Sequence, residues 1–326
     1  MGKLRFGIIG AGNIADVVAR TLSEMEEVDA YAISARDLSR AKALAEKHGF
    51  AAAYGSYDEM LRDEKVDVVY VGTTNAHHFD HAKAALLHGK HVICEKAFTL
   101  NEAQAKELCE LAKSRGLFLM EALWTRFMPF VPKLKELIDS GAIGEASSLT
   151  AAFGVYRPQN ERLYKAELGG GALLDVGLYP ITFAMLAFGE DIEHIDSAAI
   201  LNDEGVDLQN AVVFRYRDGK MAVIHSSVAA DLSNQAVICG TKGRIVIDRF
   251  WYAERILVYR DGETGSQVYG FPFEINGYEY EMRAAIEDIA AGRLENATMP
   301  HAETLRMMRL YDNLRREWGV VYPQER

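Results

Sequence analysis

The 326-residue chain is poor in cysteine and proline, and it carries fewer basic than acidic side chains. Its three cysteines are an odd number without a CxxC pair, so the sequence predicts no disulfide framework and a reducing compartment. The net charge of −11 argues against a nucleic-acid or anionic-membrane partner, because either would repel the protein. It does not exclude a local basic pocket for a phosphate group.

A signal peptide and long apolar runs are also missing from the pattern. The first apolar run is broken by glycines within a few residues, and no apolar segment is read as approaching the ~20 residues that a membrane-spanning helix needs. The sequence therefore predicts a cytoplasmic protein without a membrane partner. A hydrophobic content of 49% is ordinary for a globular protein, and the length suffices for two domains.

A glycine turn between a strand and a helix dominates the N-terminal part. The apolar run Phe6–Ile9 ends in Gly10-x-Gly12-x-x-Ala15, and a helical repeat follows. Gly10 allows the tight turn, Gly12 lets the backbone approach a pyrophosphate, and Ala15 keeps the helix close to its strand. Such a turn also occurs as a simple connection, but its place after the first strand favours a dinucleotide site. The expected contacts are Gly10, Gly12, Asn13 and Ile14.

The first third of the chain alternates between strand and helix patterns. This alternation predicts a doubly wound parallel sheet, in which ligands bind at the carboxyl ends of the strands. The expected strands are Val28–Ser34, Val66–Val71, His91–Cys94 and Leu117–Ala122. The expected helices follow the glycine turn and span Leu38–His48, Tyr57–Leu61, Phe79–Leu87 and Asn101–Lys113.

The residues after the second strand bear on the choice of cofactor. An NAD site usually has an acidic residue about twenty residues past the glycines, where it binds the ribose 2′-OH. Here Ser34 stands twenty-two residues after Gly12, and Arg36 follows it. A hydroxyl and a guanidinium suit a 2′-phosphate, which a carboxylate would repel, so we expect NADP(H) rather than NAD(H). The alternative is that Arg36 is a solvated loop residue.

Polar residues also follow the third and fourth strands. Thr73 and Asn75 are placed to line a cofactor. His77 and His81 share a helix face, but without an HExxH pattern or a nearby ligand-spaced carboxylate they indicate hydrogen-bonding groups, and we expect no metal. Glu95-Lys96 ends the fourth strand where a nicotinamide is expected. A surface ion pair is the alternative explanation for these two charges.

Past residue 122 the pattern changes to consecutive strands. Runs of strands after an alternating half predict a second, largely antiparallel α+β domain, so we expect a dinucleotide-binding domain over 1–122 and a substrate and dimerisation domain over 123–326. An open sheet has a face to cover, and a partner subunit is one way to cover it. The expected strands are Ala146–Phe153, Ile195–Leu201, Ala211–Arg217, Met221–Ser227, Ala236–Gly240, Arg244–Asp248 and Ile256–Tyr259; the helices are a segment ending at Ile138, Tyr278–Ala291 and His301–Trp318.

A triplet of glycines precedes the most informative segment of this domain. Gly169–Gly171 lets the backbone enter a helix at close quarters, and Asp175 and Tyr179 are four residues apart on one helix face. The triplet is equally compatible with a flexible turn, and Tyr179 with a packed aromatic residue.

Taken together, these motifs resemble the Gfo/Idh/MocA oxidoreductase family. The resemblance rests on the segment Gly7–Ala15, Thr74-Asn75-x-x-His78, Cys94-Glu95-Lys96 and the block Gly169–Tyr179, in this order. Tyr179, where many members have histidine, and the segments Glu121–Phe127, Gly240–Gly243 and Phe250-Trp251 are similar to the branch of dimeric dihydrodiol dehydrogenases and NADP-dependent D-xylose 1-dehydrogenases. The sequence departs from the usual Glu-Lys-Pro in having Ala97, which affects the expected backbone after Lys96.

The resemblance implies an NAD(P)-dependent oxidoreductase of a sugar, dihydrodiol or related polyol, with a Rossmann domain and a homodimer formed through the second sheet. It carries over Lys96, Asp175 and Tyr179 as the catalytic residues, and His78, Glu95 and Lys96 as further cofactor contacts. Tyr179 exchanges the proton, and a nearby ammonium lowers its pKa from ~10. Alternatives are a dinucleotide-sensing regulator and an inositol- or anhydrosugar-acting relative. Candidates for lining the substrate pocket are Trp124, Arg126, Phe153, Tyr156 and Arg162.

Overall fold

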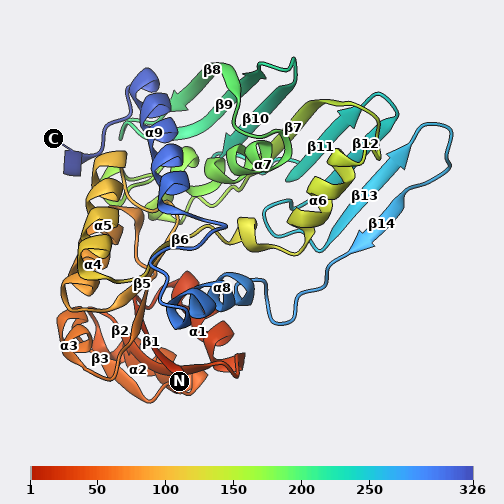
Figure 1. Cartoon of the computed structure of the whole chain (residues 1–326). Coiled ribbons are helices and arrows are strands. Elements are labelled where there is room, and N and C mark those ends of the chain that lie inside the picture. Colours follow the sequence, from red (N-terminus) through yellow and green to blue (C-terminus); the bar gives the residue numbers. More distant parts are fainter. Residues whose placement is uncertain (1, 326) are drawn as a thin grey trace. The chain divides into compact units, whose positions relative to one another are not determined.

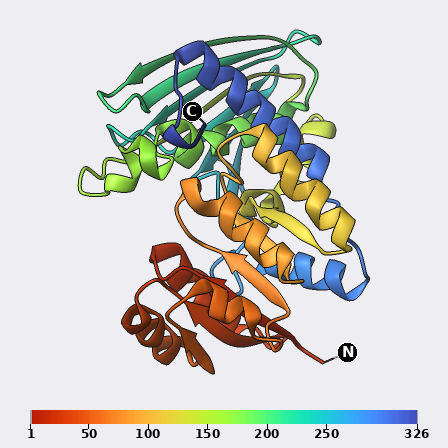
Figure 2. The same ribbon diagram turned by 90° about the vertical axis from the view of Figure 1, so that its left-hand side faces the viewer.

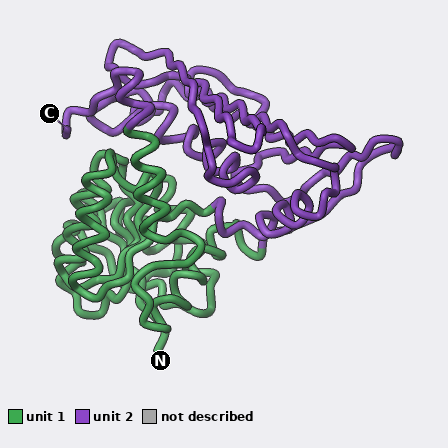
Figure 3. Tube along the Cα trace, turned by 45° about the horizontal axis from the view of Figure 1, so that its top comes forward, with its two compact units in different colours: residues 1–124, 274–312 green, residues 125–273, 313–326 purple. Residues whose placement is uncertain are grey.

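The computed structural model describes residues 2–325, and the chain divides into two compact units (Figure 3). The first unit, green in Figure 3, contains the residues up to Trp124 together with Glu274–Asp312. The second unit contains Thr125–Phe273 and the residues from Asn313 onward. Residues 274–312 thus return to the first unit. The domain boundary between residues 122 and 123 stays a prediction.

Within the described residues, the first unit has a six-stranded parallel sheet in the order β3-β2-β1-β4-β5-β6 (Figure 1). This order confirms the predicted doubly wound sheet. Strands β2 and β3 are added on one side of β1 and strands β4, β5 and β6 on the other, so the strand order reverses between β1 and β4. The strands are β1 (Leu4–Ile9), β2 (Val28–Ser34), β3 (Ala52–Tyr54), β4 (Val68–Val71), β5 (His91–Glu95) and β6 (Leu119–Ala122). The helices are α1 (Asn13–Glu24), α2 (Leu38–His48), α3 (Tyr57–Arg62), α4 (Asn75–Leu87), α5 (Glu102–Arg115) and α8 (Glu279–Ala290).

Local capping explains why the helices of this unit begin and end where they do. The Asp37 carboxylate accepts the Ser39 N–H at the start of α2, and Asn101 accepts the Gln104 N–H at the start of α5. Both helices end at a glycine in the left-handed region, Gly49 (φ 74°) and Gly116 (φ 65°), which lacks the Cβ that would oppose this conformation.

Two elements of the first unit differ from the sequence prediction by more than one or two residues at an end. The strand β3 was not predicted; its three residues are all half-buried and carry no alternating pattern. The helix α4 begins at Asn75 instead of Phe79. Thr74, whose backbone is extended, is the N-cap residue, and the first turn of the helix precedes the regular apolar repeat on which the prediction rests.

The described part of the second unit has an eight-stranded sheet in the order β14-β13-β12-β11-β7-β10-β9-β8. All neighbours are antiparallel except β7 and β10, so the mostly antiparallel prediction is confirmed; β14 was not predicted. The strands are β7 (Ala146–Gly154), β8 (Ile192–Leu201), β9 (Asp207–Tyr216), β10 (Met221–Ser227), β11 (Gln235–Gly240), β12 (Gly243–Asp248), β13 (Arg255–Arg260) and β14 (Gln267–Gly270).

Helices cover one face of this sheet. The α-helices α6 (Phe130–Asp139) and α7 (Leu178–Phe188) and the π-helical turn η4 (Leu173–Gly177) pack on it, and Figure 2 shows the strands as one layer with the green segment that includes α7 on one side. The side chains on the covered face are buried, among them Leu149, Ile224 and Phe214. The 3-10 turns of this unit are η2 (Glu161–Leu163), η3 (Ala166–Leu168) and η5 (Pro323–Glu325). The residues of the turn η1 (Trp124–Phe127) and of the helix α9 (His301–Trp318) are divided between the two units.

The segment Ala166–Phe188 corrects the expectation about apolar length. Its 23 residues are long and apolar enough to cross a membrane, with a mean hydropathy of 1.6 in the most apolar window. However, 83% of that window is buried inside the protein. The segment is therefore a core element that packs under the second sheet.

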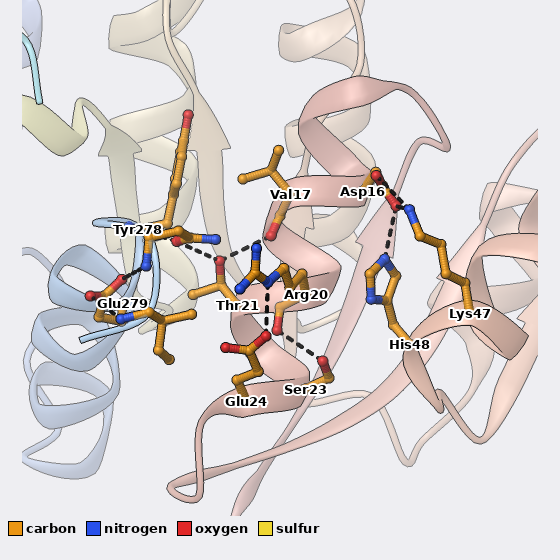
Figure 4. A network of polar contacts seen from close by, with 12 residues as sticks. Asp16, Val17, Arg20, Thr21, Ser23, Glu24, Lys47, His48, Tyr278 and Glu279 are labelled. Atoms are coloured by element: carbon orange, nitrogen blue, oxygen red, sulfur yellow. Dashed lines mark hydrogen bonds and ion pairs between the residues drawn. The ribbon is translucent and has the colours of Figure 1, made fainter. Parts of the chain in front are cut away.

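The returning segment of the first unit is fastened to α1. The Thr21 hydroxyl lies 3.0 Å from the side-chain oxygen of Asn276, and the fully buried Glu279 carboxylate accepts the backbone N–H groups of residues 274–277 (Figure 4). These four hydrogen bonds are 2.6–3.1 Å long. One side chain thus organises the turn that leads into α8.

We predict that Glu279→Gln destabilises the protein by about 2–3 kcal/mol, because the amide group that replaces one oxygen then faces backbone N–H donors. Chemical denaturation measures the loss. The exposed Glu287 on the same helix provides the control, since Glu287→Gln is expected to change the free energy of unfolding by less than about 0.5 kcal/mol. Equal stabilities of the two variants would contradict the role given to Glu279.

Candidate functional site

The predicted glycine turn lies where the sheet of the first unit reverses its strand order. Gly10 follows β1 with φ 119°, and its N–H donates to the carbonyl of Ser34 over 2.9 Å. A Cβ at Gly10 would stand 2.7 Å from the carbonyl oxygen of Gly72, at the end of β4. Glycine is therefore required twice over, by conformation and by space. This close approach brings the ends of β1 and β4 together.

The N-terminus of α1 is open to a ligand. Gly12 is the N-cap residue; no side chain caps the helix there, and a Cβ at Gly12 would meet nothing within 4 Å. Gly12 and Asn13 are exposed, whereas Ala15 is fully buried against the sheet. One turn later, Asp16 accepts from Lys47 over 2.6 Å and lies 2.8 Å from His48 Nε2, which ties α1 to α2 (Figure 4). Backbone N–H groups at such a terminus bind phosphate.

The end of β2 carries the residues predicted to select the cofactor. Ser34 is fully buried, and its hydroxyl donates to the carbonyl of Ile8 over 3.1 Å, so it belongs to the strand framework. Arg36 is exposed and lines a cavity of about 430 Å³ together with Tyr57 and His81. Burial lowers the pKa of His81 to about 4, so this histidine is neutral at pH 7. A phosphate in this cavity would meet the guanidinium of Arg36.

The predicted contacts after β4 lie at the start of α4, and two of them, Thr73 and His78, are within hydrogen-bond distance of each other. Asn75, the first residue of α4, is buried, and Thr73 Oγ1 lies 3.0 Å from His81 Nδ1. His78 is buried, with Nδ1 2.8 Å from the carbonyl oxygen of Ala97 and Nε2 3.1 Å from that of Thr73. Burial lowers its pKa to about 4. His78 thus connects the loop after β4 with the loop after β5.

The pair Glu95-Lys96 ends β5, and its two members differ in environment. The Glu95 carboxylate is buried; one oxygen accepts from the hydroxyl of Tyr70 and the other from the backbone N–H of Lys96 over 3.1 Å. Lys96 is half-buried, and the peptide bond between Lys96 and Ala97 is cis. Glu95 therefore holds the backbone of Lys96 from a buried position.

In the second unit the structure brings two predicted residues into direct contact. Arg162, expected to line the substrate pocket, donates through Nη1 to Asp175 Oδ1 over 2.8 Å. Asp175 lies within the π-helical turn η4, and Tyr179 is the second residue of α7. Both residues are buried. The predicted helix across Asp175 and Tyr179 is present, but its first turn is a π-helix, a feature that often marks a functional site.

Aromatic rings surround Tyr179. The ring of Phe153 lies 5.7 Å from that of Tyr179 and stacks on Trp251 at 3.7 Å. In the sequence, only the family resemblance points to Trp251, because the turn between two strands in which it lies carries no motif of its own. Of the remaining candidates, Tyr156 is 57% exposed and Arg126 is half-buried in η1. Trp124, in the first unit, stacks on Tyr278 at 4.1 Å.

The residues of the first unit fit a dinucleotide. The space beside Gly12, the uncapped helix N-terminus and the cavity at Arg36 match a pyrophosphate and a phosphorylated ribose in chemistry. Among the described residues, no group of three or more histidine, cysteine, aspartate or glutamate side chains is arranged to hold a metal ion. The polar and aromatic groups at Tyr179 are suited to a hydroxylated carbon skeleton.

Comparison with known proteins agrees with this assignment. Residues 4–123 match the oxidoreductase family with NAD-binding Rossmann fold, GFO/IDH/MocA, and residues 131–246 match the GFO/IDH/MocA C-terminal domain. The trans-1,2-dihydrobenzene-1,2-diol dehydrogenases of Danio rerio and Xenopus tropicalis are each 35% identical and cover 99% and 98% of this chain and 99% of their own. The crystal structure of KijD10, a 3-ketoreductase from Actinomadura kijaniata in complex with NADP and TDP-benzene, is 28% identical with a TM-score of 0.88 and covers 97% of this chain and 98% of that one.

We predict that the two glycines of the turn respond differently to a methyl group. Gly12→Ala should keep the thermal stability of the protein and weaken NADPH binding at least tenfold, since φ at Gly12 is −96° and the added Cβ occupies only ligand space. Gly10→Ala should lose both stability and binding. Differential scanning fluorimetry and NADPH fluorescence titration measure the two effects, and unchanged binding by Gly12→Ala would contradict the assignment of the turn.

Proposed function

The chain belongs to the GFO/IDH/MocA oxidoreductase family, and from this premise we propose that it transfers a hydride between NADP(H) and a carbon of a sugar or cyclic vicinal diol. The observation that carries the proposal is the surroundings of Tyr179. A hydroxyl group that can exchange a proton lies among aromatic rings, on the same helical segment as an aspartate paired with an arginine. Aromatic rings suit the apolar face of a carbon ring, and the charged pair suits its hydroxyl groups.

The preference for NADP(H) is supported by charge. Arg36 lines a cavity next to the end of β2, where NAD-binding proteins place a carboxylate, and a guanidinium favours a 2′-phosphate by a charge-assisted hydrogen bond. KijD10, which is 28% identical over nearly the whole length, was crystallised with NADP. In the proposed complex the backbone after Gly12 holds the pyrophosphate, and Thr73, Asn75 and His78 shape the floor of the site.

The proposed chemistry divides between the cofactor and three side chains. When bound, NADP(H) supplies or accepts the hydride. Tyr179 removes the proton of the substrate hydroxyl during oxidation and returns it during reduction. Lys96 supplies positive charge that stabilises the negatively charged oxygen formed in this exchange, and Glu95 fixes the backbone of that lysine. Asp175, held by Arg162, orients the hydroxyl groups of the substrate.

The substrate class follows from the site and from the named relatives. Two relatives that align with this chain over 99% of their own length are trans-1,2-dihydrobenzene-1,2-diol dehydrogenases, and KijD10 is a 3-ketoreductase. We extend to this chain the kind of reacting group that these names share, an alcohol or a ketone, and propose that it is carried by a carbon ring. The side chains proposed to contact this ring are Trp124, Arg126, Phe153, Tyr156 and Arg162.

The proposed domains are residues 1–122, which bind the dinucleotide, and residues 123–326, which bind the substrate and form the dimer. The proposed location is the cytoplasm.

The uncovered face of the second sheet supports a homodimer. Val213, Val223, Thr150 and Val237 are register neighbours on the adjacent strands β9, β10, β7 and β11, and they form a row of β-branched side chains that point away from the covering helices. Met221 (43% exposed) and Val223 (41% exposed) lie on this face. A second copy of the chain would bury this apolar row, which is why we propose association through this sheet.

Tyr179→Phe and Lys96→Met should each lower kcat by about 10²–10⁴-fold, the range expected for loss of a proton-transfer group, while NADPH still binds. If the two residues act in one step, the double variant should lose little more than the worse single variant. Steady-state kinetics with trans-1,2-dihydrobenzene-1,2-diol and D-xylose provides the measurement. Tyr269→Phe and Lys135→Met are matched controls outside the site; near-normal turnover of either site variant would refute the assignment.

Replacing Arg36 by leucine should weaken NADP(H) binding by about 10- to 100-fold and leave NAD(H) binding nearly unchanged, because only the former has a phosphate for the guanidinium to bind. Fluorescence titration with both cofactors measures the ratio of dissociation constants. Arg20→Leu, on the exposed part of α1, is the control. Parallel losses for both cofactors would contradict the proposed contact.

The dimer is tested by placing a charge on the apolar row. Val223→Glu should shift the mass measured by light scattering from that of a dimer to that of the 36.3-kDa chain, because two like charges would be buried together. Leu87→Glu, at an exposed apolar position of the first unit, should leave the mass unchanged. A wild-type protein of monomer mass would refute the proposed association.

A further inference from the structure

An aspartate with no part in the chemistry described above lies under the glycine triplet of the second unit. Asp207, at the start of β9, has no solvent exposure. Its Oδ2 accepts the backbone N–H of Leu173 over 2.8 Å and the side-chain N–H of Asn210 over 2.8 Å. Its other oxygen, Oδ1, has no hydrogen-bond donor among the described residues. The carboxylate thus accepts the backbone N–H of the first residue of η4.

The glycine triplet is shaped around this carboxylate. Gly171 has φ 116°, and a Cβ there would stand 2.4 Å from Asp207 Oδ1. A Cβ at Gly170 would stand 2.7 Å from the carbonyl oxygen of Arg162. The Gly171 N–H also donates to the carbonyl of Leu163 over 3.0 Å. Asp207, the triplet and the loop that carries Arg162 therefore form one packed unit without room for side chains in the turn.

This unit fixes the residues that the proposed function needs. Leu173 begins the π-helical turn, Asp175 lies at its centre, and Tyr179 follows directly in α7. The backbone of Arg162 packs on Gly170, and its guanidinium donates to Asp175 Oδ1 over 2.8 Å. A change in the position of Leu173 would therefore move Asp175 relative to both Arg162 and Tyr179. Catalytic geometry tolerates little displacement, since a shift of about 1 Å can reduce the rate about 100-fold.

The charge on Asp207 does not serve stability. Burial raises its pKa to about 6, against which the hydrogen bonds from Asn210 and Leu173 and the charge of Arg315 act only in part. The other titratable groups at this place are Tyr322, whose hydroxyl donates to the carbonyl of Gly170, and Glu325, which pairs with Arg315. Because the pKa is higher in the folded than in the unfolded chain, this group contributes less stability as the pH rises from about 4 through 6. At pH 7 the fold holds an ionised carboxylate at the expense of stability, as functional sites commonly do.

We propose that Asp207 is a positioning residue of the reaction: its ionised carboxylate holds the start of the π-helical turn and thereby sets Asp175 and Tyr179 in their working positions. The inference rests on the proposed function, because it assigns work to these two residues. Protonated or amidated, the side chain binds the two N–H donors less strongly, and the turn is held less firmly. Asp207 itself does not touch the substrate in this proposal.

The test is Asp207→Asn, which has the shape of the protonated aspartate. With trans-1,2-dihydrobenzene-1,2-diol or D-xylose as substrate, we expect kcat at pH 7.5 to fall at least tenfold, the KM for NADP⁺ to stay within twofold, and the melting temperature to stay equal or rise. A residue with a purely structural role would lower the melting temperature instead. Unchanged kcat, or a fall in kcat accompanied by a lower melting temperature, overturns the proposal.

Asp288→Asn is the matched control, because Asp288 is likewise buried and accepts an asparagine side-chain N–H, from Asn296. It lies in α8 of the first unit. After this helix, the carbonyl of Leu294 accepts the N–H of Leu119, the first residue of the edge strand β6. We expect this variant to lower the melting temperature and to leave kcat unchanged. If Asp288→Asn lowers kcat as much as Asp207→Asn does, the proposal fails.

A measurement on the unmodified protein does not depend on whether the variant folds. The kcat of the wild type should fall as the pH drops below about 6, while its melting temperature does not fall over the same range, and Asp207→Asn should lack this acid limb. A wild-type kcat that is constant between pH 7.5 and 5 overturns the proposal. Wild-type protein without any NADP⁺-dependent turnover would refute the proposed function instead, so the two failures are distinguishable.

Discussion

The close approach of two backbone segments at Gly10 and Gly72 is the constraint on which the first unit depends. Where the chain leaves β1 toward α1, a Cβ on Gly10 would stand 2.7 Å from the carbonyl oxygen of Gly72, so only a glycine fits there. This close approach lies at the reversal of strand order, where doubly wound sheets bind their ligands. The uncapped start of α1, the cavity at Arg36 and the loops of Thr73 and Lys96 all follow from strands that end at this edge.

The second unit applies the same device to a helix. Its glycine triplet admits the carbonyl of Arg162 on one side and the carboxylate of Asp207 on the other, and the chain leaves the triplet directly into the π-helical turn. Buried polar groups thereby determine the position of Asp175, and aromatic rings determine that of Tyr179. In both units a glycine is present because a polar backbone or side-chain group occupies the place of its Cβ.

Sequence patterns predicted the fold and much of the framework, because strand–helix alternation and helix caps are local signals. Val28–Ser34, Met221–Ser227 and His301–Trp318 were predicted with their observed bounds. The strand β3 was missed, since three half-buried residues carry no period, and so was the π-helical turn, which a spacing of four residues does not distinguish from an α-helix. The residues assigned to catalysis and cofactor binding remain predictions.

The features of the site that the sequence does not predict depend on contacts between residues that are far apart in the chain. Nothing near Glu95 in the sequence indicates that its carboxylate is engaged by Tyr70, twenty-five residues away. The spacing that predicts Ser34 as a cofactor contact does not reveal that its hydroxyl donates to the carbonyl of Ile8 on the neighbouring strand. Asp207 precedes Ala211, where the predicted strand begins, and its partner Leu173 is thirty-four residues away. Such contacts are created by the fold, so no local pattern predicts them.

The central claim is that this protein moves a hydride between NADP and a carbon that bears a hydroxyl group. It is tested most directly by incubating the protein with NADP⁺ and a substrate deuterated at that carbon, either D-xylose at C1 or trans-1,2-dihydrobenzene-1,2-diol at its carbinol carbons, and analysing the reduced cofactor by mass spectrometry. The account predicts one deuterium in each molecule of NADPH formed with at least one of these substrates. Reduced cofactor without deuterium, or no reduction with either substrate, would contradict it.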